Sequence, residues 1–460
     1  MAVRSHPFTG WKSPQAYTSG KKPFLIHLEM IELMQRKEFI QKIGKGIAAY
    51  SVLPISTSLG RPTHHSNKQS LQTMDSPYVP EGYHLLWEDN FEGKALDESE
   101  WFYRMDLKMA SGQRKENVKV EQGKLVLAMK KEDFLGMKYT GGGIVSKRRW
   151  QHGYYEVKAK LTQAPGWHHA FWSQAGTGFL TYSYDRFMEI DVFEMEQTNA
   201  SNHNLWIHGD GWSSDQHKWA SVHARPLSFD ASDGYHIYGY EYTTEGLSFY
   251  VDGKQVHQIA AKEDDYKHYA LNLWLTVIAT HSDSAGDLPA YDYFDYIRCY
   301  SKDANAKIPP KVEPVLETQS PIYIDNYDPW GFNMGNYWEI STEGDTYHGK
   351  NYYKWKPGKT YNPLRDWALF RPLIPADGLY DLYLRWPAGQ DRAAKVPLEI
   401  WYDGGAKVDK TKSINQQEHD GEWVKIGQYP LKKGWNNMIK LLAKGSGYTV
   451  ADTAKFVRKK

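Results

Sequence analysis

The segment that decides the fold and points to the chemistry is Arg186-Phe-Met-Glu-Ile-Asp-Val-Phe-Glu-Met-Glu196. Side chains of a β-strand alternate between its two faces, so Glu189 and Asp191 share one face while the apolar residues between them point into a core. Strict alternation would then place Phe193, rather than Glu194, on the acidic face. One extra residue, a β-bulge, returns Glu194 to the side of Glu189. We therefore expect three acids on one face of a half-buried strand.

Three carboxylates this close repel one another, so at least one proton should be held well above its ordinary pKa. Retaining glycoside hydrolysis needs such an arrangement, with one ionised carboxylate that attacks carbon and one protonated carboxyl about 5–5.5 Å away. We predict that Glu189 is the nucleophile, that Glu194 is the acid/base, and that Asp191 orients the nucleophile. The alternatives are an exposed acidic strand edge or a calcium site; the intervening Ile, Val and Phe argue against an exposed edge.

The sequence around this segment predicts an all-β fold. Short apolar or alternating runs recur between Gly, Asn and Asp residues, as in Tyr235–Tyr242 and Leu247–Val256. The second run contains Asp252-Gly253 between two strand-like halves, a strong hairpin signal. Helical periodicity is absent over long stretches, so a β-sandwich is favoured over alternating βαβ units.

The composition restricts the classes of function. Lys and Arg total 56 and Asp and Glu total 55, so the chain has no net field to hold nucleic acid or an anionic membrane. Aromatic residues make up 15%, with 18 Trp and 33 Tyr, which suits strands and also sugar binding by stacked rings. The only cysteine is Cys299, so a monomer has no disulfide. We expect no cofactor, while structural calcium in either sandwich stays open.

Changes in composition predict four parts of the chain. Residues 1–76 are an extension, 77–303 form the catalytic domain, 304–320 are a Pro-rich linker and 321–460 form a second strand-rich domain. Within the extension, the basic run Met34–Lys42 precedes a short apolar stretch, as in an export signal that starts at Met34. The alternative is an amphipathic surface helix. We expect a secreted, periplasmic or surface protein without a membrane span, because the apolar stretch is short and interrupted.

The run Glu189-Ile-Asp-Val-Phe-Glu194 resembles the E-x-D-x-x-E signature of glycoside hydrolase family 16. The likeness extends over about residues 80–302, through Pro80–Phe91, Gly142–Lys147, Gly166–Trp172 and Tyr293–Tyr300. The resemblance implies a concanavalin A-like jelly-roll sandwich with an open cleft and a retaining, double-displacement mechanism.

The same resemblance suggests residues that bind substrate. Trp167 and Trp172 match cleft tryptophans of the family, with a partly core position as the alternative for Trp172. His203 resembles a histidine of carrageenase-like members, or it is a loop histidine without such a role. Trp206 and Trp274 are further candidate platforms, as are Trp212 and Trp219, with ordinary packing as the alternative for each.

The expected substrate is a β-linked polysaccharide, and we favour a red-algal galactan of the carrageenan, agar or porphyran type. The residues after the acidic motif resemble carrageenase-type more than laminarinase-type enzymes. Arg148, in the basic run Lys147-Arg-Arg149, could meet sulfate esters together with His168 and His169. The run can instead be a solvated strand end. A laminarinase-type β-1,3-glucanase and a non-catalytic polysaccharide-binding surface protein are the alternative functions.

Residues 321–460 resemble the golvesin-type, xanthan-lyase-like C-terminal domain. The matching pieces include Ile324–Asp328, Ala368–Pro372, Gly378–Trp386 and Gly421–Gly427. The resemblance implies a second, smaller β-sandwich with a carbohydrate-binding role, which would raise the effective concentration of the enzyme on a polymer. A structural or cell-surface spacer is the alternative.

Overall fold

A computed structural model describes residues 76–460, apart from 177–185, 208–217, 261–267, 282–285, 314–315, 317, 329, 336–337, 348–350, 359 and 460. The described residues belong to one compact unit. The predicted export signal lies outside them. No helix within these ranges is long and apolar enough to cross a membrane.

The first part of the described chain contains eighteen strands and one 3₁₀ turn. Eleven strands form one sheet, in the order β16-β15-β14-β9-β18-β6-β7-β4-β3, with β1 paired to β18 and β5 to β6. The other seven form a second sheet, β13-β12-β11-β10-β17-β8-β2. The elements are β1 (His84–Asp89), β2 (Trp101–Tyr103), β3 (Leu107–Lys108), β4 (Ser111–Gln113), η1 (Lys115–Asn117), β5 (Val118–Glu121), β6 (Lys124–Phe134), β7 (Met137–Gly141), β8 (Gly143–Trp150), β9 (Gly153–Lys160), β10 (Trp167–Gly176), β11 (Arg186–Gln197), β12 (Ala200–Ile207), β13 (Lys218–Pro226), β14 (His236–Thr243), β15 (Gly246–Val251), β16 (Lys254–Ala260), β17 (Leu271–Ala279) and β18 (Ala290–Ser301).

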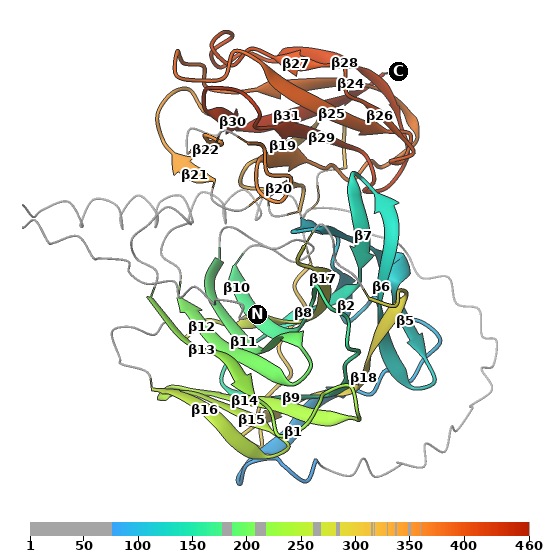
Figure 1. Ribbon diagram of the computed structural model, residues 1–460, viewed down its shortest axis with the longest axis vertical. Helices are drawn as coiled ribbons and strands as arrows, with labels where there is room; N and C mark the ends of the chain where they lie inside the picture. Colours follow the sequence, from blue (N-terminus) through green and yellow to red (C-terminus); the bar gives the residue numbers. More distant parts are fainter. Residues whose placement is uncertain are drawn as a thin grey trace, which may run out of the picture. The chain divides into compact units, whose positions relative to one another are not determined.

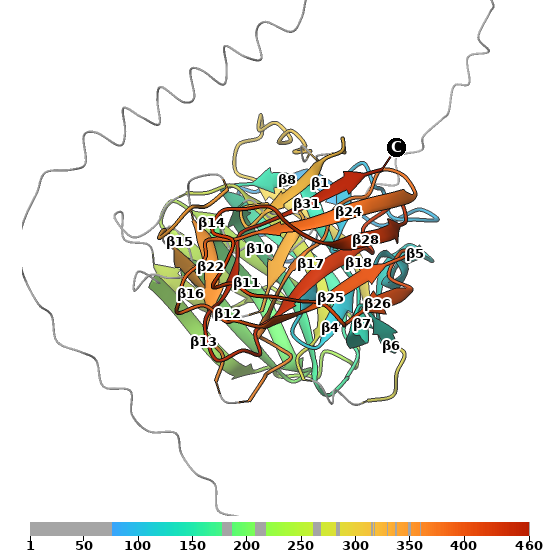
Figure 2. The same ribbon diagram turned by 90° about the horizontal axis from the view of Figure 1, so that it is seen from above.

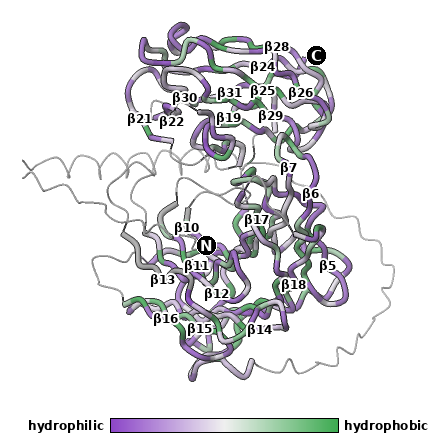
Figure 3. The backbone as a smooth tube through the Cα atoms, viewed as in Figure 1, coloured by the Kyte–Doolittle hydropathy of each residue, from purple (hydrophilic) through white to green (hydrophobic). Residues whose placement is uncertain are grey.

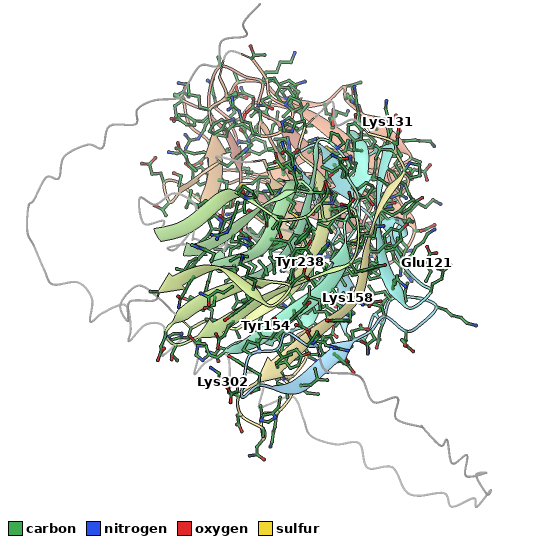
Figure 4. The ribbon with its side chains drawn as sticks, turned by 60° about the horizontal axis from the view of Figure 1, so that its bottom comes forward. Glu121, Lys131, Tyr154, Lys158, Tyr238 and Lys302 are labelled. Carbon is green, nitrogen blue, oxygen red and sulfur yellow. The ribbon has the colours of Figure 1, made fainter. Side chains whose placement is uncertain are left out.

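The two sheets face each other as layers of a sandwich, with β10–β13 above β14–β16 in Figure 1. Aromatic residues join the layers: the rings of Phe193 and Tyr238 are 4.7 Å apart, and those of Phe171 and Tyr240 are 6.0 Å apart. Figure 4 labels Tyr238 between the strands. Along the strands, hydrophobic stretches alternate with hydrophilic ones, as Figure 3 shows. The predicted all-β sandwich is confirmed.

Residues after β18 form a second, smaller β-sandwich. Its strands, several of which are seen side by side in Figure 2, make sheets in the orders β19-β31-β24-β28, β20-β23-β29-β25-β26 with β27 on β25, and β21-β22-β30. The strands are β19 (Ile322–Asp325), β20 (Phe332–Met334), β21 (Glu339–Ser341), β22 (Tyr352–Trp355), β23 (Trp367–Phe370), β24 (Gly378–Arg385), β25 (Val396–Tyr402), β26 (Lys407–Asp409), β27 (Ser413–Ile414), β28 (Val424–Leu431), β29 (Met438–Leu442), β30 (Thr449–Ala451) and β31 (Thr453–Arg458).

The two sandwiches have separate hydrophobic cores and share a small third cluster. In this cluster Leu107, Leu135 and Met137 of the first sandwich pack with Trp367 and Leu369 of the second. The single cysteine, Cys299, is fully buried in the core of the first sandwich, and burial raises the pKa of its thiol well above the ordinary value.

Candidate active site on the seven-stranded sheet

Strand β11 contains the bulge that the sequence predicts. On one side, Phe193 pairs with Phe171 and Asp191 with Trp172, so Val192 is an extra residue against β10. On the other side, Asp191 pairs with Asn204 and Glu194 with Asn202, which leaves two β11 residues opposite a single residue of β12. The bulge therefore breaks the alternation between Asp191 and Glu194 and turns Glu194 to the face of the other two acids.

Hydrogen bonds and strand pairing place the three acidic side chains on one face. The Asn204 side-chain amide donates to Asp191 Oδ2 at 3.0 Å and to Glu194 Oε2 at 2.6 Å. Trp206 Nε1 donates to Asp191 Oδ2 at 3.0 Å. Trp206 is also the cross-strand partner of Glu189, and side chains of directly paired residues point to the same side. We call this surface of the sheet the acidic face.

The environment of Asp191 favours its protonated form. Its side chain is 1% exposed, and burial, followed by the negative charges of Glu194 and Glu189, raises its pKa well above the ordinary value. The hydrogen bonds from Asn204 and Trp206 oppose this rise. A proton on the central acid removes one of three like charges from the face.

Glu194 is the most open of the three acids, since its side chain is 23% exposed, whereas Glu189 is 7% exposed. Its Oε1 lies 3.1 Å from Nε2 of His168. Trp172 pairs with Asp191 across the sheet, so its ring also lies on the acidic face, and its Nε1 donates to Thr276 at 3.0 Å.

The expectation that Trp167 binds substrate is contradicted by its position. Strand β10 runs without irregularity against β17, so residues an odd number apart, such as Trp167 and Trp172, point to opposite faces. Trp167 is 0% exposed in the core and packs edge-on against Tyr139. His169 has the same orientation and lies 2.7 Å from Asp292 inside the sandwich.

His203 also points into the core rather than to the acidic face, so its expected contact with substrate is wrong. It is 1% exposed and stands opposite the two bulged residues of β11. Its Nδ1 donates to the carbonyl of Val192 at 2.6 Å, and its ring packs beside Phe249. Burial lowers the pKa of His203 to about 4, so the ring is neutral at pH 7.

Arg148 was expected to bind sulfate, but its guanidinium is instead bound to an acidic side chain and to a backbone carbonyl that follows the first sandwich. Its guanidinium donates to Glu100 at 2.9 and 3.2 Å and to the carbonyl of Pro309. The neighbouring Arg149 donates to Asn272, which lies in the same cross-strand row as Gln174 and Glu189. Arg149 is therefore the arginine of the basic run that belongs to the acidic face.

The remaining candidate tryptophans differ in position. Trp206 is half-buried on the acidic face through its bond to Asp191. Trp274 stacks on Trp172 at 4.5 Å and 25°, but it is 0% exposed, so it supports that ring rather than offering a platform of its own. Trp212 and the side chain of Trp219 lie outside the described residues.

Two functional candidates were missed or given another role by sequence reasoning. Asn204 bonds both Asp191 and Glu194. Its position on the acidic face could be predicted from the alternation of β12, because it is two residues from Trp206. The position of His168 on this face could be predicted in the same way, because it is four residues from Trp172 on β10. Among the described residues, no group of three or more His, Cys, Asp or Glu could hold a metal ion.

The fold and the site define a class: an all-β protein of two sandwiches, the larger of which carries clustered carboxylates on one sheet. Residues 106–293 match the sequence profile of Glycosyl hydrolases family 16, and residues 322–458 match that of the Golvesin C-terminal domain. The first sandwich is therefore similar to glycosyl hydrolases of family 16, and the second is similar to the Golvesin C-terminal domain.

Individual relatives are distant. The chain is 28% identical to the kappa-carrageenase of Pseudoalteromonas carrageenovora over 263 residues, which covers 47% of this chain and 64% of the relative. It is 30% identical to a beta-glucanase of Acetivibrio thermocellus over 142 residues, or 31% of this chain and 39% of the relative. It is 29% identical to the xanthan lyase of Bacillus sp. (strain GL1) over 150 residues, or 32% of this chain and 15% of the relative.

The chain thus spans less than two thirds of each of these curated relatives. Among solved structures, the laminarinase catalytic domain of Thermotoga petrophila RKU-1 is 24% identical with a TM-score of 0.40. That comparison covers 48% of this chain and 98% of the solved one.

Proposed function

We propose that the chain is a retaining endo-glycoside hydrolase that cleaves a β-linked polysaccharide on the acidic face of its first sandwich. The observation that carries this proposal is the bulge at Val192, which brings Glu189, Asp191 and Glu194 to one side of a single strand. A cluster of like charges costs stability, and it is useful where one carboxylate must attack while another carboxyl gives up a proton.

In the proposed mechanism Glu189 attacks the anomeric carbon, and Glu194 donates its proton to the leaving glycosidic oxygen. The C–O bond to the leaving sugar breaks, and a glycosyl ester to Glu189 forms. Glu194, now ionised, takes a proton from water, which attacks the same carbon and releases Glu189. Two inversions at one carbon give net retention. Glu194 suits the acid/base role because it is the most open of the three acids, so water can reach it.

Asp191 and its partners position this pair. The protonated form favoured by Asp191 lets Glu189 stay ionised without a second negative charge between the reacting groups. Asn204 links Asp191 to Glu194, so the carboxyl groups are held at a fixed spacing while the proton moves.

A red-algal galactan is the substrate that we favour, and Arg149 supports it. Arg149 lies on the acidic face three strands away from Glu189, where it can meet a sulfate or another oxyanion further along the polymer, because its fork of donors matches an oxyanion. The kappa-carrageenase relative covers nearly half of the chain, which agrees with this choice.

A laminarinase-type or mixed-linkage β-glucanase is the second candidate. It is favoured by the beta-glucanase relative, which has a higher sequence identity to this chain than the kappa-carrageenase has, although over a shorter stretch. We also propose that the protein acts outside the cytoplasm on its polymer, as suits an enzyme of insoluble polysaccharides.

The test is hydrolysis of a panel of agarose, porphyran, carrageenans, furcellaran and laminarin by the full chain and by Glu189→Gln. The variant keeps the shape of the side chain but removes the nucleophile, so product release should fall about 10³-fold or more. Products are sized by chromatography, and the anomer formed first is read by NMR, where retention is expected.

Short oligomers from one galactan alone would support the favoured substrate, whereas oligomers from laminarin alone would support the second candidate. Unchanged hydrolysis by Glu189→Gln would contradict the assignment of Glu189 as the nucleophile. Binding of a polymer without release of any reducing ends by the parent chain would instead identify a non-catalytic binding protein.

A further inference from the structure

The outer face of one sheet in the second sandwich carries a continuous row of tyrosine and lysine. Tyr323 of β19 pairs with Lys455 of β31, which pairs with Tyr383 of β24, which in turn pairs with Lys425 of β28. We call these four residues the Tyr–Lys row. Their strand neighbours are core residues, so the row itself points outward, and each of its members is half-buried or exposed.

Two loop aromatics converge on the row. The ring of Tyr347 stacks on Tyr323 at 5.4 Å and 14°. The ring of Trp423 lies 5.7 Å from that of Tyr323 and 5.3 Å from that of Tyr347. All three rings are half-buried, so part of each remains accessible. Such a cluster offers a broad, rigid aromatic surface with little rotamer entropy to lose on binding.

A lysine with no acidic counter-charge sits within this surface. Lys455 Nζ lies 4.3 Å from the ring centre of Trp423 and 4.5 Å from that of Tyr383. No carboxylate lies within ion-pair distance of Lys455 in the described part of the chain, whereas Lys425 is paired with Asp381 at 2.7 Å. The rings hold the ammonium group in place without neutralising it.

The opposite side of this sandwich is already occupied. There Trp367, Leu369, Met438 and Leu442 of β23 and β29 pack with residues of the first sandwich. The Tyr–Lys row belongs to the other main sheet, and its four strands cover about 14 Å at the usual spacing between strands. This is the length of a short oligosaccharide.

We propose that the Tyr–Lys row, with Tyr347 and Trp423, is a binding site for an anionic polysaccharide. The rings stack on the apolar faces of the sugars, and Lys455 meets a sulfate or carboxylate group on the chain. The charge is complementary, and an ammonium group held against aromatic rings keeps its attraction for an anion. This site lies on a different domain from the proposed hydrolytic site and does not depend on its chemistry.

The experiment measures binding by the full chain carrying Glu189→Gln, so that the polymer stays intact. Electrophoresis through gels that contain κ-carrageenan, alginate or laminarin gives a dissociation constant from the retardation. We expect retardation by one or both charged polymers; κ-carrageenan tests sulfate and alginate tests carboxylate. Trp423→Ala should weaken this binding about tenfold, the usual scale for loss of one stacked ring. Lys455→Gln should weaken it several-fold, and Lys455→Arg should restore it.

Two matched controls separate this site from general effects. Lys425→Gln removes a lysine of the same row whose charge Asp381 already balances, so it should change binding less than twofold. Tyr448→Ala removes a half-buried ring that also lies near two lysines, 5.3 and 5.5 Å away, but outside the cluster, and it should bind like the parent. Thermal unfolding of each variant checks that the second sandwich is intact.

Parent-like binding by folded Trp423→Ala and Lys455→Gln would overturn the site. If Trp423→Ala and Lys455→Gln weaken retardation by laminarin as much as retardation by the charged polymers, the anionic class of ligand is overturned. Residual hydrolysis by the Glu189→Gln chain would count against Glu189 as the nucleophile but would not affect the proposed binding site at the Tyr–Lys row. The two proposals can therefore be contradicted independently.

Discussion

The Nδ1 atom of His203 donates a hydrogen bond to the carbonyl oxygen of Val192 at 2.6 Å, and Val192 is the extra residue of the bulge in β11. A bulged residue loses its regular ladder partners, so its buried carbonyl needs another donor. His203 supplies it from the strand opposite. A core histidine thus stabilises the kink that places the acids together on one face.

The first prediction concerns this contact. His203→Leu removes the donor, the bulge loses a buried hydrogen bond, and Glu194 should shift relative to Glu189. We expect kcat to fall on the order of 10²-fold with little change in KM, since small displacements of reacting groups are costly. His203→Asn places an amide donor near the position of Nδ1 and should recover most of kcat. Equal losses of kcat in the two variants would contradict the role of the hydrogen bond.

The second prediction concerns stability against acid. The pKa of His203 is about 4 in the folded protein and about 6.5 when unfolded, so the unfolded state binds the extra proton first as the pH falls. The contribution of His203 to the free energy of unfolding is therefore at its full value above about pH 6.5, and it falls progressively as the pH is lowered to about 4. Urea unfolding of the parent at pH 7 and pH 4.5 should show a loss that is about 2 kcal/mol larger than that of His203→Asn. Parallel losses in parent and variant would argue against a buried neutral histidine.

The third prediction concerns Asn204. Asn204→Ala deletes the amide that bonds both Asp191 and Glu194, and its bond to Asp191 favours the ionised form of that acid. Without this bond the pKa of Asp191 should rise further, so any limb of the pH–rate profile that follows this acid should move to higher pH. We also expect kcat to fall roughly tenfold. A profile of unchanged shape and position would show that Asp191 does not titrate in the reaction.

The fourth prediction compares two adjacent arginines. Arg149 bonds Asn272 on the acidic face, whereas Arg148 is bound to Glu100 and Pro309. Arg149→Gln should raise KM for a sulfated polymer about tenfold, the scale of one charge-assisted hydrogen bond, with a smaller effect on kcat. Arg148→Gln should lower the melting temperature and leave KM unchanged. A rise in KM for Arg148→Gln alone would reverse these assignments.

Much of this site could be predicted from the sequence because the alternation of strands is a strict geometric rule. Glu189 and Asp191 had to share a face, and a single extra residue was enough to bring Glu194 to them. The same rule was available for Trp167: it is five residues from Trp172, an odd separation, so both could not line one surface. The resemblance to the family predicts Trp167 in the cleft, and the alternation of the strand contradicts it.

The alternation rule also applies to His203. It is three residues from Trp206 on a strand that pairs regularly between them, so both side chains could not line one surface. The error at Arg148 has another cause, because its guanidinium is bound by Glu100 and by a carbonyl 161 residues later in the chain. A pairing with so distant a segment leaves no local signal, so strand periodicity alone could not assign Arg148.

The complete burial of Cys299 makes the chain convenient for site-directed labelling. Its thiol is inaccessible in the folded state, and its raised pKa disfavours the reactive thiolate. One cysteine introduced at a surface position of each sandwich would therefore be the only reactive thiols, without any need to remove the native one. A pair of fluorophores attached there would report, by energy transfer, whether the two sandwiches move relative to each other when a polymer is bound.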